Sequence, residues 1–322
     1  MTRSGPVQAA AVVGGLGGRA AWSELAPWMT RARIRGAVGR GELVRAARGI
    51  YALPDLPPAQ LAAARARGAL SFATAAEFWG LELVRRSDAV HVTVARGARP
   101  AGQDGVTVHQ SALTAEEVRD GVTSPLRTVL DCATALPFRE GLAVADSALA
   151  LRFVTARELV DAAQRSAGPG RPRRIAVARS ADRRAANALE SALRGTLLER
   201  RLDGFEPQHA VWLNGREVHV DLGDGDRRMA IEAEGYATHG SRSAFAADCE
   251  RYDELGRRGW LVLRFAWGRS CSGRTGSQTS SQSPAPGEMD DGSGPPTDAP
   301  RHASGSSQVQ VGSARRRRVA DI

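Results

Sequence analysis

Two neighbouring stretches decide the fold of the C-terminal part: His209-Ala-Val-Trp-Leu-Asn-Gly-Arg-Glu-Val-His-Val-Asp221 and Arg228-Met-Ala-Ile-Glu-Ala-Glu234. Apolar and polar residues alternate in both, which is the period of a β-strand. Asn214-Gly215 divides the first stretch, and this dipeptide favours a two-residue hairpin turn because both turn positions need positive φ. We therefore expect antiparallel strands over 208–213, 216–222 and 228–234.

Four carboxylates lie in or beside these expected strands. Glu232 and Glu234 share one strand face about 6.6 Å apart, Asp221 ends the neighbouring strand, and Glu190 lies on an expected helix over 187–200. Carboxylates held close together repel one another unless a cation relieves them. The pattern therefore predicts a metal site. The alternatives are an ordinary turn role for Asp221 and a solvent-facing edge strand for Glu232 and Glu234.

The expected element order continues with a helix over 245–258 and a short buried strand over 260–265. Across residues 186–267, a set of motifs follows one another in a fixed order: Leu189-Glu190-Ser191, Val220-Asp221-Leu222, Ile231-Glu232-Ala233-Glu234-Gly235, His239, Asp248-Cys-Glu-Arg251, Leu255, Gly259-Trp260 and Leu263-Arg264-Phe265. Together they resemble the PD-(D/E)XK nuclease-like domain of unknown function that is related to the very-short-patch-repair (Vsr) endonuclease. The resemblance implies a restriction-endonuclease-like αβββαβ core.

The resemblance also implies a chemistry for these residues. Asp221 and Glu232 would bind Mg²⁺ or Mn²⁺, with Glu190 completing the catalytic acidic set, and the ion would polarise a phosphate and activate water. Glu234 occupies the place of the catalytic lysine. The chain has no lysine, so its 44 basic residues are all arginine, which stays protonated and cannot act as a base. Glu234 would therefore position or deprotonate the water.

Three further residues are accessory candidates at this site: His239, Asp248 and Arg251. His239 is equally well explained as a loop histidine without a ligand role. Asp248 and Arg251 lie three positions apart on the expected helix, so a surface ion pair is their alternative role.

The N-terminal part carries a different pattern. We expect two short helices within 6–27, a third over 31–38 capped by Thr30, and a hairpin over 41–54. This order predicts a winged helix, whose third helix enters the major groove of DNA while the hairpin contacts phosphate. The expected DNA contacts are Arg31, Arg33, Arg35, Arg45 and Arg48. The alternative is that these arginines only keep the surface soluble.

The stretch Arg48-Gly49-Ile50-Tyr51-Ala52-Leu53-Pro54 resembles the signature of the N-terminal antitoxin domain of the abortive-infection (AbiEi) family. That resemblance implies DNA binding that autoregulates a toxin–antitoxin operon, with an operon promoter and a cognate toxin as partners. Residues 62–165 continue it as a mixed α/β middle region. There we expect a helix over 64–79, strands over 89–94 and 106–109, and helices beginning at 124, 141 and 155. We expect a structural role for Asp131.

These patterns predict an α+β or α/β fold in five parts. They are a winged-helix domain (1–56), the middle region (62–165), a linker rich in Gly, Pro and Arg (166–180), the nuclease-like domain (181–269) and a tail (270–322). The tail is dominated by Ser, Gly, Pro, Gln and Asp, a composition that does not bury enough apolar surface to fold. We expect it to be disordered, and its abrupt start raises the hypothesis of a frameshift.

Composition narrows the choice of partner. A net charge of +9 over 322 residues favours a polyanion such as DNA, although arginine bias is also typical of a high-GC, actinobacterial-type genome. Three cysteines without metal or disulfide spacing indicate a cytoplasmic protein, and no apolar run predicts a membrane span. Two functions follow: a Mg²⁺-dependent DNA endonuclease, or a non-catalytic antitoxin-like transcriptional regulator.

Overall fold

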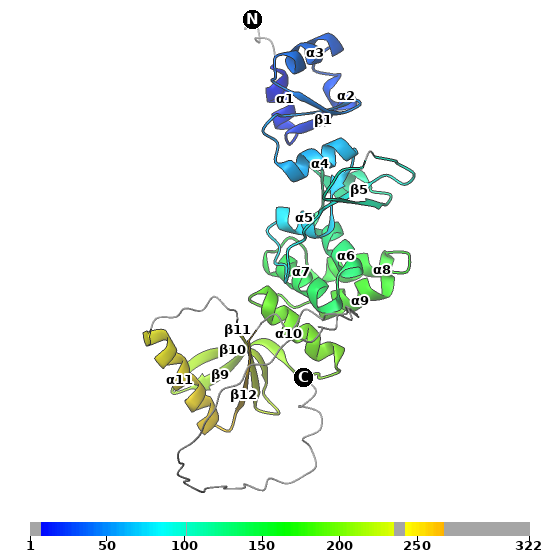
Figure 1. Ribbon diagram of the computed structural model, residues 1–322. Coiled ribbons are helices and arrows are strands. Elements are labelled where there is room, and N and C mark those ends of the chain that lie inside the picture. Colours follow the sequence, from blue (N-terminus) through cyan, green and yellow to red (C-terminus); the bar gives the residue numbers. More distant parts are fainter. Residues whose placement is uncertain (1–7, 101, 235–241, 267–322) are drawn as a thin grey trace, which may run out of the picture. The chain divides into compact units, whose positions relative to one another are not determined.

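The computed structural model describes residues 8–100, 102–234 and 242–266, which form a mixed α/β protein (Figure 1). Its strands make three sheets of three, five and four strands in chain order. The α+β class expected from the sequence is confirmed at this level. Within the described ranges, every helix is too short or too polar to span a membrane.

The N-terminal region combines three helices with a small antiparallel sheet ordered β1-β3-β2. Its elements are α1 (Ala9–Gly15), β1 (Arg19–Ala21), α2 (Trp22–Leu25), α3 (Arg31–Gly39), β2 (Val44–Ala47) and β3 (Ile50–Ala52). Thr30 caps α3 as expected, because its hydroxyl accepts the N–H of Arg33. Ile34 and Ala37 face a core that also holds Val13 and Leu25, which leaves the arginines of α3 exposed.

The middle region begins with a five-stranded mixed sheet ordered β6-β5-β4-β8-β7. Its elements are α4 (Pro58–Ala66), β4 (Ala69–Leu70), α5 (Phe72–Phe78), β5 (Val90–Val94), β6 (Val106–Gln110), the 3-10 turn η1 (Ala115–Glu117), β7 (Val118–Arg119) and β8 (Val122–Thr123). The expected single helix over 64–79 is wrong. Arg67 turns the chain with φ +56°, and a Cβ at Gly68 would lie only 2.6 Å from the carbonyl oxygen of Thr93. The chain therefore enters the sheet at β4.

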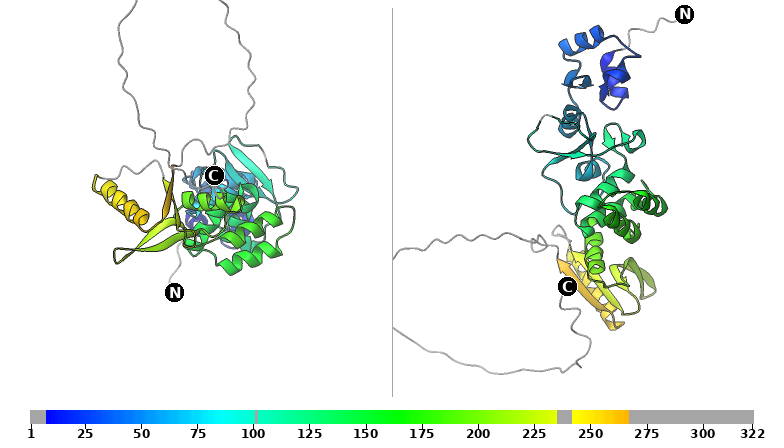
Figure 2. Two further views of the ribbon diagram at one scale, coloured as in Figure 1. Left: turned by 90° about the horizontal axis from the view of Figure 1, so that it is seen from below. Right: turned by 90° about the vertical axis from the view of Figure 1, so that its right-hand side faces the viewer.

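Four helices follow and pack on one another: α6 (Pro125–Ala135), α7 (Phe138–Ala150), α8 (Ala156–Arg165) and α9 (Arg171–Ser180). They lie side by side in both views of Figure 2. Ser124 and Thr155 cap α6 and α8 as expected. The segment 166–180 differs from the expected linker, because α9 occupies most of it and buries Val177 and Ala178 in the helical core. Asp131 is 2% exposed and accepts from Arg127, a structural role.

The C-terminal region contains α10 (Ala188–Glu199), β9 (Glu206–Leu213), β10 (Arg216–Asp224), β11 (Met229–Glu234), α11 (Arg242–Arg257) and β12 (Leu261–Ala266). The sheet order is β12-β11-β10-β9. Both β9–β10 and β10–β11 are antiparallel, as expected, whereas β11 and β12 are parallel. Asn214 and Gly215 have φ of +48° and +78°, which confirms the hairpin turn. The expected tail, 270–322, lies outside the described residues.

Candidate functional site

The backbone pairing of β10 with β11 stops next to Asp221, and a hydrogen bond to the side chain of Asp221 replaces it. The described backbone pairs are Asp224–Met229, Gly223–Ala230 and Leu222–Ile231. Beyond these pairs, the N–H of Ala233 donates to Oδ2 of Asp221 at 2.8 Å. A side-chain carboxylate of β10 is therefore the acceptor where a backbone carbonyl would be the acceptor in a regular strand pair. This fixes the carboxylate between the two strands and beside Glu232, rather than in a turn.

Glu190 reaches the same sheet from α10. The residue is fully buried, and its Oε2 accepts the N–H of Ala186 at 3.0 Å and the side-chain amide of Gln208 at 2.9 Å. Its other oxygen, Oε1, is buried without a hydrogen-bond partner in the described part of the chain. An unsatisfied buried carboxylate oxygen is costly, and a cation or a metal-bound water is the kind of ligand that would satisfy it.

Glu232 does not face solvent on an edge strand. It is 5% exposed on β11, an inner strand of the sheet, and its Oε1 accepts from Nη1 of Arg251 at 3.1 Å. The same Nη1 donates to the carbonyl oxygen of His219 at 3.3 Å, so Arg251 ties α11 to two strands. Asp248 is 3.7 Å from Arg251 and mostly exposed. Arg251 thus belongs to the acidic cluster and is more than a member of a surface pair.

The three acidic residues influence one another. Burial raises the pKa of Glu190 to about 7, with the hydrogen bonds from Ala186 and Gln208 lowering it and the charge of Asp221 raising it. Burial also raises the pKa of Glu232 to about 7, with Arg251 lowering it and Asp221 raising it. Two carboxyl groups with such pKa values around a third carboxylate make a site that gains from a positive charge.

The donor set fits a hard divalent cation that keeps part of its hydration. Among the side chains that the structure describes, no three His, Cys, Asp or Glu residues converge closely enough to surround an ion. Mg²⁺ in proteins is commonly held by one or two carboxylates and several waters. Asp221 and Glu232 could supply the direct ligands, with Glu190 binding a water of the ion.

Two expected residues of this site, Glu234 and His239, lie at the edge of the described residues or outside them. Glu234 ends β11, where its backbone pairs with Ala266, and its side chain is outside the described part. His239 lies outside the described residues altogether. Asp224, by contrast, accepts the N–H of Arg227 at 2.9 Å, which is the ordinary turn role that its sequence context favours.

The five N-terminal arginines are all exposed. Arg31, Arg33 and Arg35 project from α3, Arg45 from β2, and Arg48 from the turn between β2 and β3. The guanidinium of Arg31 lies over the ring of Trp22, 4.7 Å from its centroid. Trp28, just before α3, is 60% exposed. This basic and aromatic surface could contact a nucleic acid.

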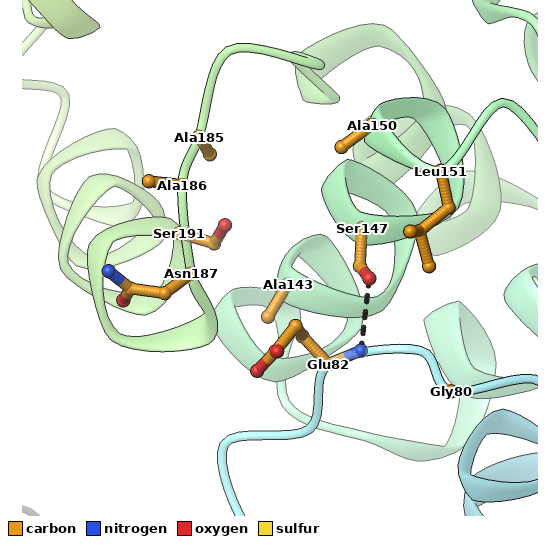
Figure 3. Close-up of a pocket in the computed structure, with 10 residues that line it drawn as sticks. All are labelled: Gly80, Glu82, Ala143, Ser147, Ala150, Leu151, Ala185, Ala186, Asn187 and Ser191. Carbon is orange, nitrogen blue, oxygen red and sulfur yellow. Dashed lines mark hydrogen bonds between the residues drawn. The ribbon is translucent and has the colours of Figure 1, made fainter.

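A cavity of about 150 Å³ lies between α7, the segment from Gly80 to Glu82, and the start of α10 (Figure 3). Its walls are mainly Ala, Ser and Gly residues, and Ser147 accepts the N–H of Glu82 at 3.0 Å. Glu82 is the one titratable residue in its lining. The cavity therefore offers less chemistry than the acidic cluster nearby.

Two residues of the site were not found from the sequence. Gln208 holds Glu190 with its side-chain amide, and Tyr252 accepts from Nη2 of Arg251 at 2.9 Å. The contact of Gln208 with Glu190 joins two elements that only the tertiary fold brings together. Tyr252 neighbours Arg251 on α11, and it reaches the site only because the fold brings Arg251 to Glu232.

Similarity to known proteins assigns no family to this chain. No protein-family model matches the chain, and no curated protein matches it. Among solved structures, it is similar to the crystal structure of the RV2827C protein from Mycobacterium tuberculosis, at 18% identity over 66% of this chain and 90% of that chain, with a TM-score of 0.30. A similarity of this size assigns neither a fold nor a function.

Proposed function

We propose that this chain is a DNA-binding protein whose C-terminal region is a metal-dependent DNA endonuclease of the PD-(D/E)XK class. The observation that carries the proposal is the position of Asp221, whose carboxylate lies between β10 and β11 and whose charge raises the pKa of both Glu232 and buried Glu190. The order α10-β9-β10-β11-α11-β12 supports it, because it matches the αβββαβ core that the sequence resemblance implies.

In this proposal the cation is Mg²⁺ or Mn²⁺. The ion supplies charge stabilisation at a phosphate and lowers the pKa of a bound water. Asp221 and Glu232 would hold it, and Glu190 would bind one of its waters through the oxygen that lacks a partner in the described structure. Glu234, at the end of β11, takes the place of the missing lysine.

The N-terminal region brings the substrate to this centre. Its order α1-β1-α2-α3-β2-β3 and its three-stranded sheet support a winged helix of the AbiEi antitoxin type. With α3 in the major groove, Arg31, Arg33 and Arg35 contact the groove and its phosphates, while Arg45 and Arg48 rest on the neighbouring backbone.

Cleavage of supercoiled and mismatched plasmid in Mg²⁺ or Mn²⁺ tests the catalytic part. We expect nicking by the full chain, and its loss in Asp221→Ala and Glu232→Ala. Asp226→Ala, an exposed carboxylate in the adjoining turn, is the matched control and should still cut. If no metal supports cutting, or if the three variants cut alike, the enzyme proposal is wrong.

A second candidate is a non-catalytic antitoxin-like regulator of its own promoter. The ion pair of Arg251 with Glu232 favours it, because a guanidinium already neutralises one carboxylate, and the chain has no lysine to assist a reaction. Such a protein would keep the fold for binding alone.

Footprinting on the protein's own promoter tests the regulator. Arg33→Ala combined with Arg35→Ala should weaken protection. It should also make the slope of log affinity against log salt concentration shallower by the equivalent of about two phosphate contacts. Arg157→Ala with Arg165→Ala, on exposed positions of α8, removes the same charge elsewhere. Equal footprints for both double variants would reject α3 as the recognition helix.

A further inference from the structure

Two histidines of the middle region face each other through their ring nitrogens. His91 lies on β5 and His109 on β6, the parallel edge strand of the same sheet, and both side chains are half-buried. Nδ1 of His91 is 2.9 Å from Nε2 of His109. The rings are nearly parallel, at 18°, with their centroids 5.2 Å apart. They therefore meet edge to edge, and the two nitrogens share one hydrogen.

Ser87 decides which nitrogen of His91 carries a proton. Its Oγ lies 2.9 Å from Nε2 of His91 and 2.9 Å from the carbonyl oxygen of Ala89. A hydroxyl group has one hydrogen to donate, and a carbonyl oxygen has none. The hydroxyl hydrogen must therefore lie between the two oxygens, and Nε2 of His91 donates to Ser87. This leaves Nδ1 of His91 with a lone pair that faces His109, and it leaves Ser87 unsuited to act as a nucleophile with His91 as its base.

The second ring is held in place and is uncharged. The ring of Phe72 stacks on that of His109 at 28°, with the centroids 3.9 Å apart. Burial lowers the pKa of both histidines, so each ring is neutral at neutral pH. In the hydrogen bond, Nε2 of His109 is the donor. If this proton moves to Nδ1 of the same ring, both facing nitrogens carry lone pairs and the pair stays uncharged.

This arrangement fits a transition-metal ion. Neutral imidazole nitrogens suit Zn²⁺, Ni²⁺ and Cu²⁺, and a metal-binding histidine usually donates its other N–H to an oxygen, as His91 does to Ser87. Tetrahedral Zn²⁺ holds two nitrogens about 3.3 Å apart, so the facing nitrogens need to separate by only about 0.4 Å. Within the described residues no group of three His, Cys, Asp or Glu forms, so water would complete the coordination.

We propose that Nδ1 of His91 and Nε2 of His109 together bind a transition-metal ion of the Zn²⁺, Ni²⁺ and Cu²⁺ class, with Ser87 as the positioning residue of His91. The ion takes the place of the shared hydrogen and ties β5 to the edge strand β6. This site differs from the proposed Mg²⁺ site in its ligands, because imidazole suits transition metals whereas carboxylates suit Mg²⁺ and Mn²⁺. It does not depend on the proposed function.

Long-range proton–nitrogen NMR spectra of the histidine side chains in the full chain test the site at pH 7.5. Without metal, His91 should show the neutral form that carries its proton on Nε2. One equivalent of Zn²⁺ should shift the signals of Nδ1 of His91 and Nε2 of His109 to those of metal-bound nitrogen. The signals of His219, whose side chain is 47% exposed on β10, should not move. Zinc that shifts neither member of the pair, or that shifts His219 equally, overturns the proposal.

Calorimetric titration with Zn²⁺ compares variants of the full chain. His109→Gln should abolish this binding, and Ser87→Ala should weaken it by roughly tenfold, as loss of an orienting partner does. His219→Gln, which removes an imidazole elsewhere, should bind as the unaltered protein does, and so should Glu232→Gln. Zinc binding that is lost in Glu232→Gln and kept in His109→Gln places the ion at the acidic cluster. That result overturns the histidine site and leaves the proposed function standing.

Discussion

Glu190 places an ionisable carboxyl group in a buried position, which selection for stability alone would not favour. Its carboxyl group is buried on α10 and has a pKa of about 7 instead of the ordinary 4.5. The folded protein therefore holds a proton there that the unfolded chain releases. Its contribution to stability is present below about pH 4.5 and is lost as the pH rises towards 7, because ionisation then favours the unfolded state.

Replacing this carboxyl group with an amide should consequently stabilise the metal-free protein. At pH 8, Glu190→Gln should raise the free energy of unfolding by roughly 3 kcal/mol, from 1.36 kcal/mol per pKa unit. The gain should vanish near pH 4.5. Urea unfolding at both pH values measures it, and Glu199→Gln, on the same helix but 36% exposed, is the control. A loss of stability at pH 8 would show that the carboxylate is a structural anchor.

His109 gives a second dependence on pH, far from the acidic cluster. Burial and the neighbouring His91 lower the pKa of His109 to about 4, and the rings share a hydrogen bond of 2.9 Å between Nδ1 of His91 and Nε2 of His109. The unfolded chain binds a proton at this side chain below about pH 6.5, whereas the folded protein does not until about pH 4. The free energy of unfolding should therefore decrease as the pH drops from about 6.5 to about 4.

His109→Gln should make this fall shallower between pH 6.5 and 4. The measurement is the midpoint of urea unfolding as a function of pH. The same substitution at His219, whose side chain is 47% exposed, serves as the control. If the two variants have parallel pH profiles, the lowered pKa assigned to His109 is wrong.

At the scale of elements, local signals predicted local structure. The Asn214-Gly215 turn and the strands on either side of it follow from residues that neighbour one another in the chain, and so do the caps Thr30, Ser124 and Thr155. The parallel pairing of β12 with β11 and the two-residue strand β4 do not, because they depend on distant partners. Gly68 makes β4 possible only by its close approach to Thr93.

The acidic site followed the same rule. The sequence placed Asp221 and Glu232 near each other because adjacent strands carry them. It assigned Arg251 at most an accessory role, since the contact of 3.1 Å with Glu232 joins α11 to a strand 19 residues earlier. The segment 166–180 lacks a clear apolar stripe, so its sequence predicts a linker although α9 occupies most of it.

Replacing glycine by alanine should have opposite effects on stability at Gly215 and at Gly256, and this difference tests the hairpin turn. Gly215 has φ +78° in the β9–β10 turn, whereas Gly256 is a helical residue of α11, and neither would bring a new Cβ near another atom. Gly215→Ala should destabilise by about 1–2 kcal/mol through backbone strain. Gly256→Ala should stabilise by about 0.5–1 kcal/mol. Thermal unfolding of both variants checks the signs, and stabilisation by Gly215→Ala would contradict the turn.

For the whole molecule, a buried ion pair ties the helical region to the acidic site. Nη2 of Arg194 lies 2.8 Å from Oδ2 of Asp146, and their side chains are 8% and 1% exposed. Asp146 also accepts the N–H of Asp182 at 2.7 Å. Arg194 is one helical turn beyond Glu190 on α10, so this pair fixes the helix that carries the third carboxylate.

Breaking the pair from one side should be costly. Asp146→Ala leaves a buried guanidinium without its partner, and we expect a loss of about 3–5 kcal/mol. Asp146→Leu combined with Arg194→Met removes both charges and should recover much of that loss. Urea unfolding of the single and double variants gives the comparison. A double variant no more stable than Asp146→Ala would show that α7 and α10 are held mainly by packing.

The central claim is that Asp221 and Glu232 hold one divalent cation, with Glu190 binding one of its waters. Calorimetric titration of the full chain with Mn²⁺ at pH 8 tests it most directly, without any requirement for turnover or for a DNA sequence. We predict one saturable site that is lost in both Asp221→Asn and Glu232→Gln and retained in the turn variant Asp226→Asn. The absence of saturable binding, or equal binding by all four proteins, would contradict the claim.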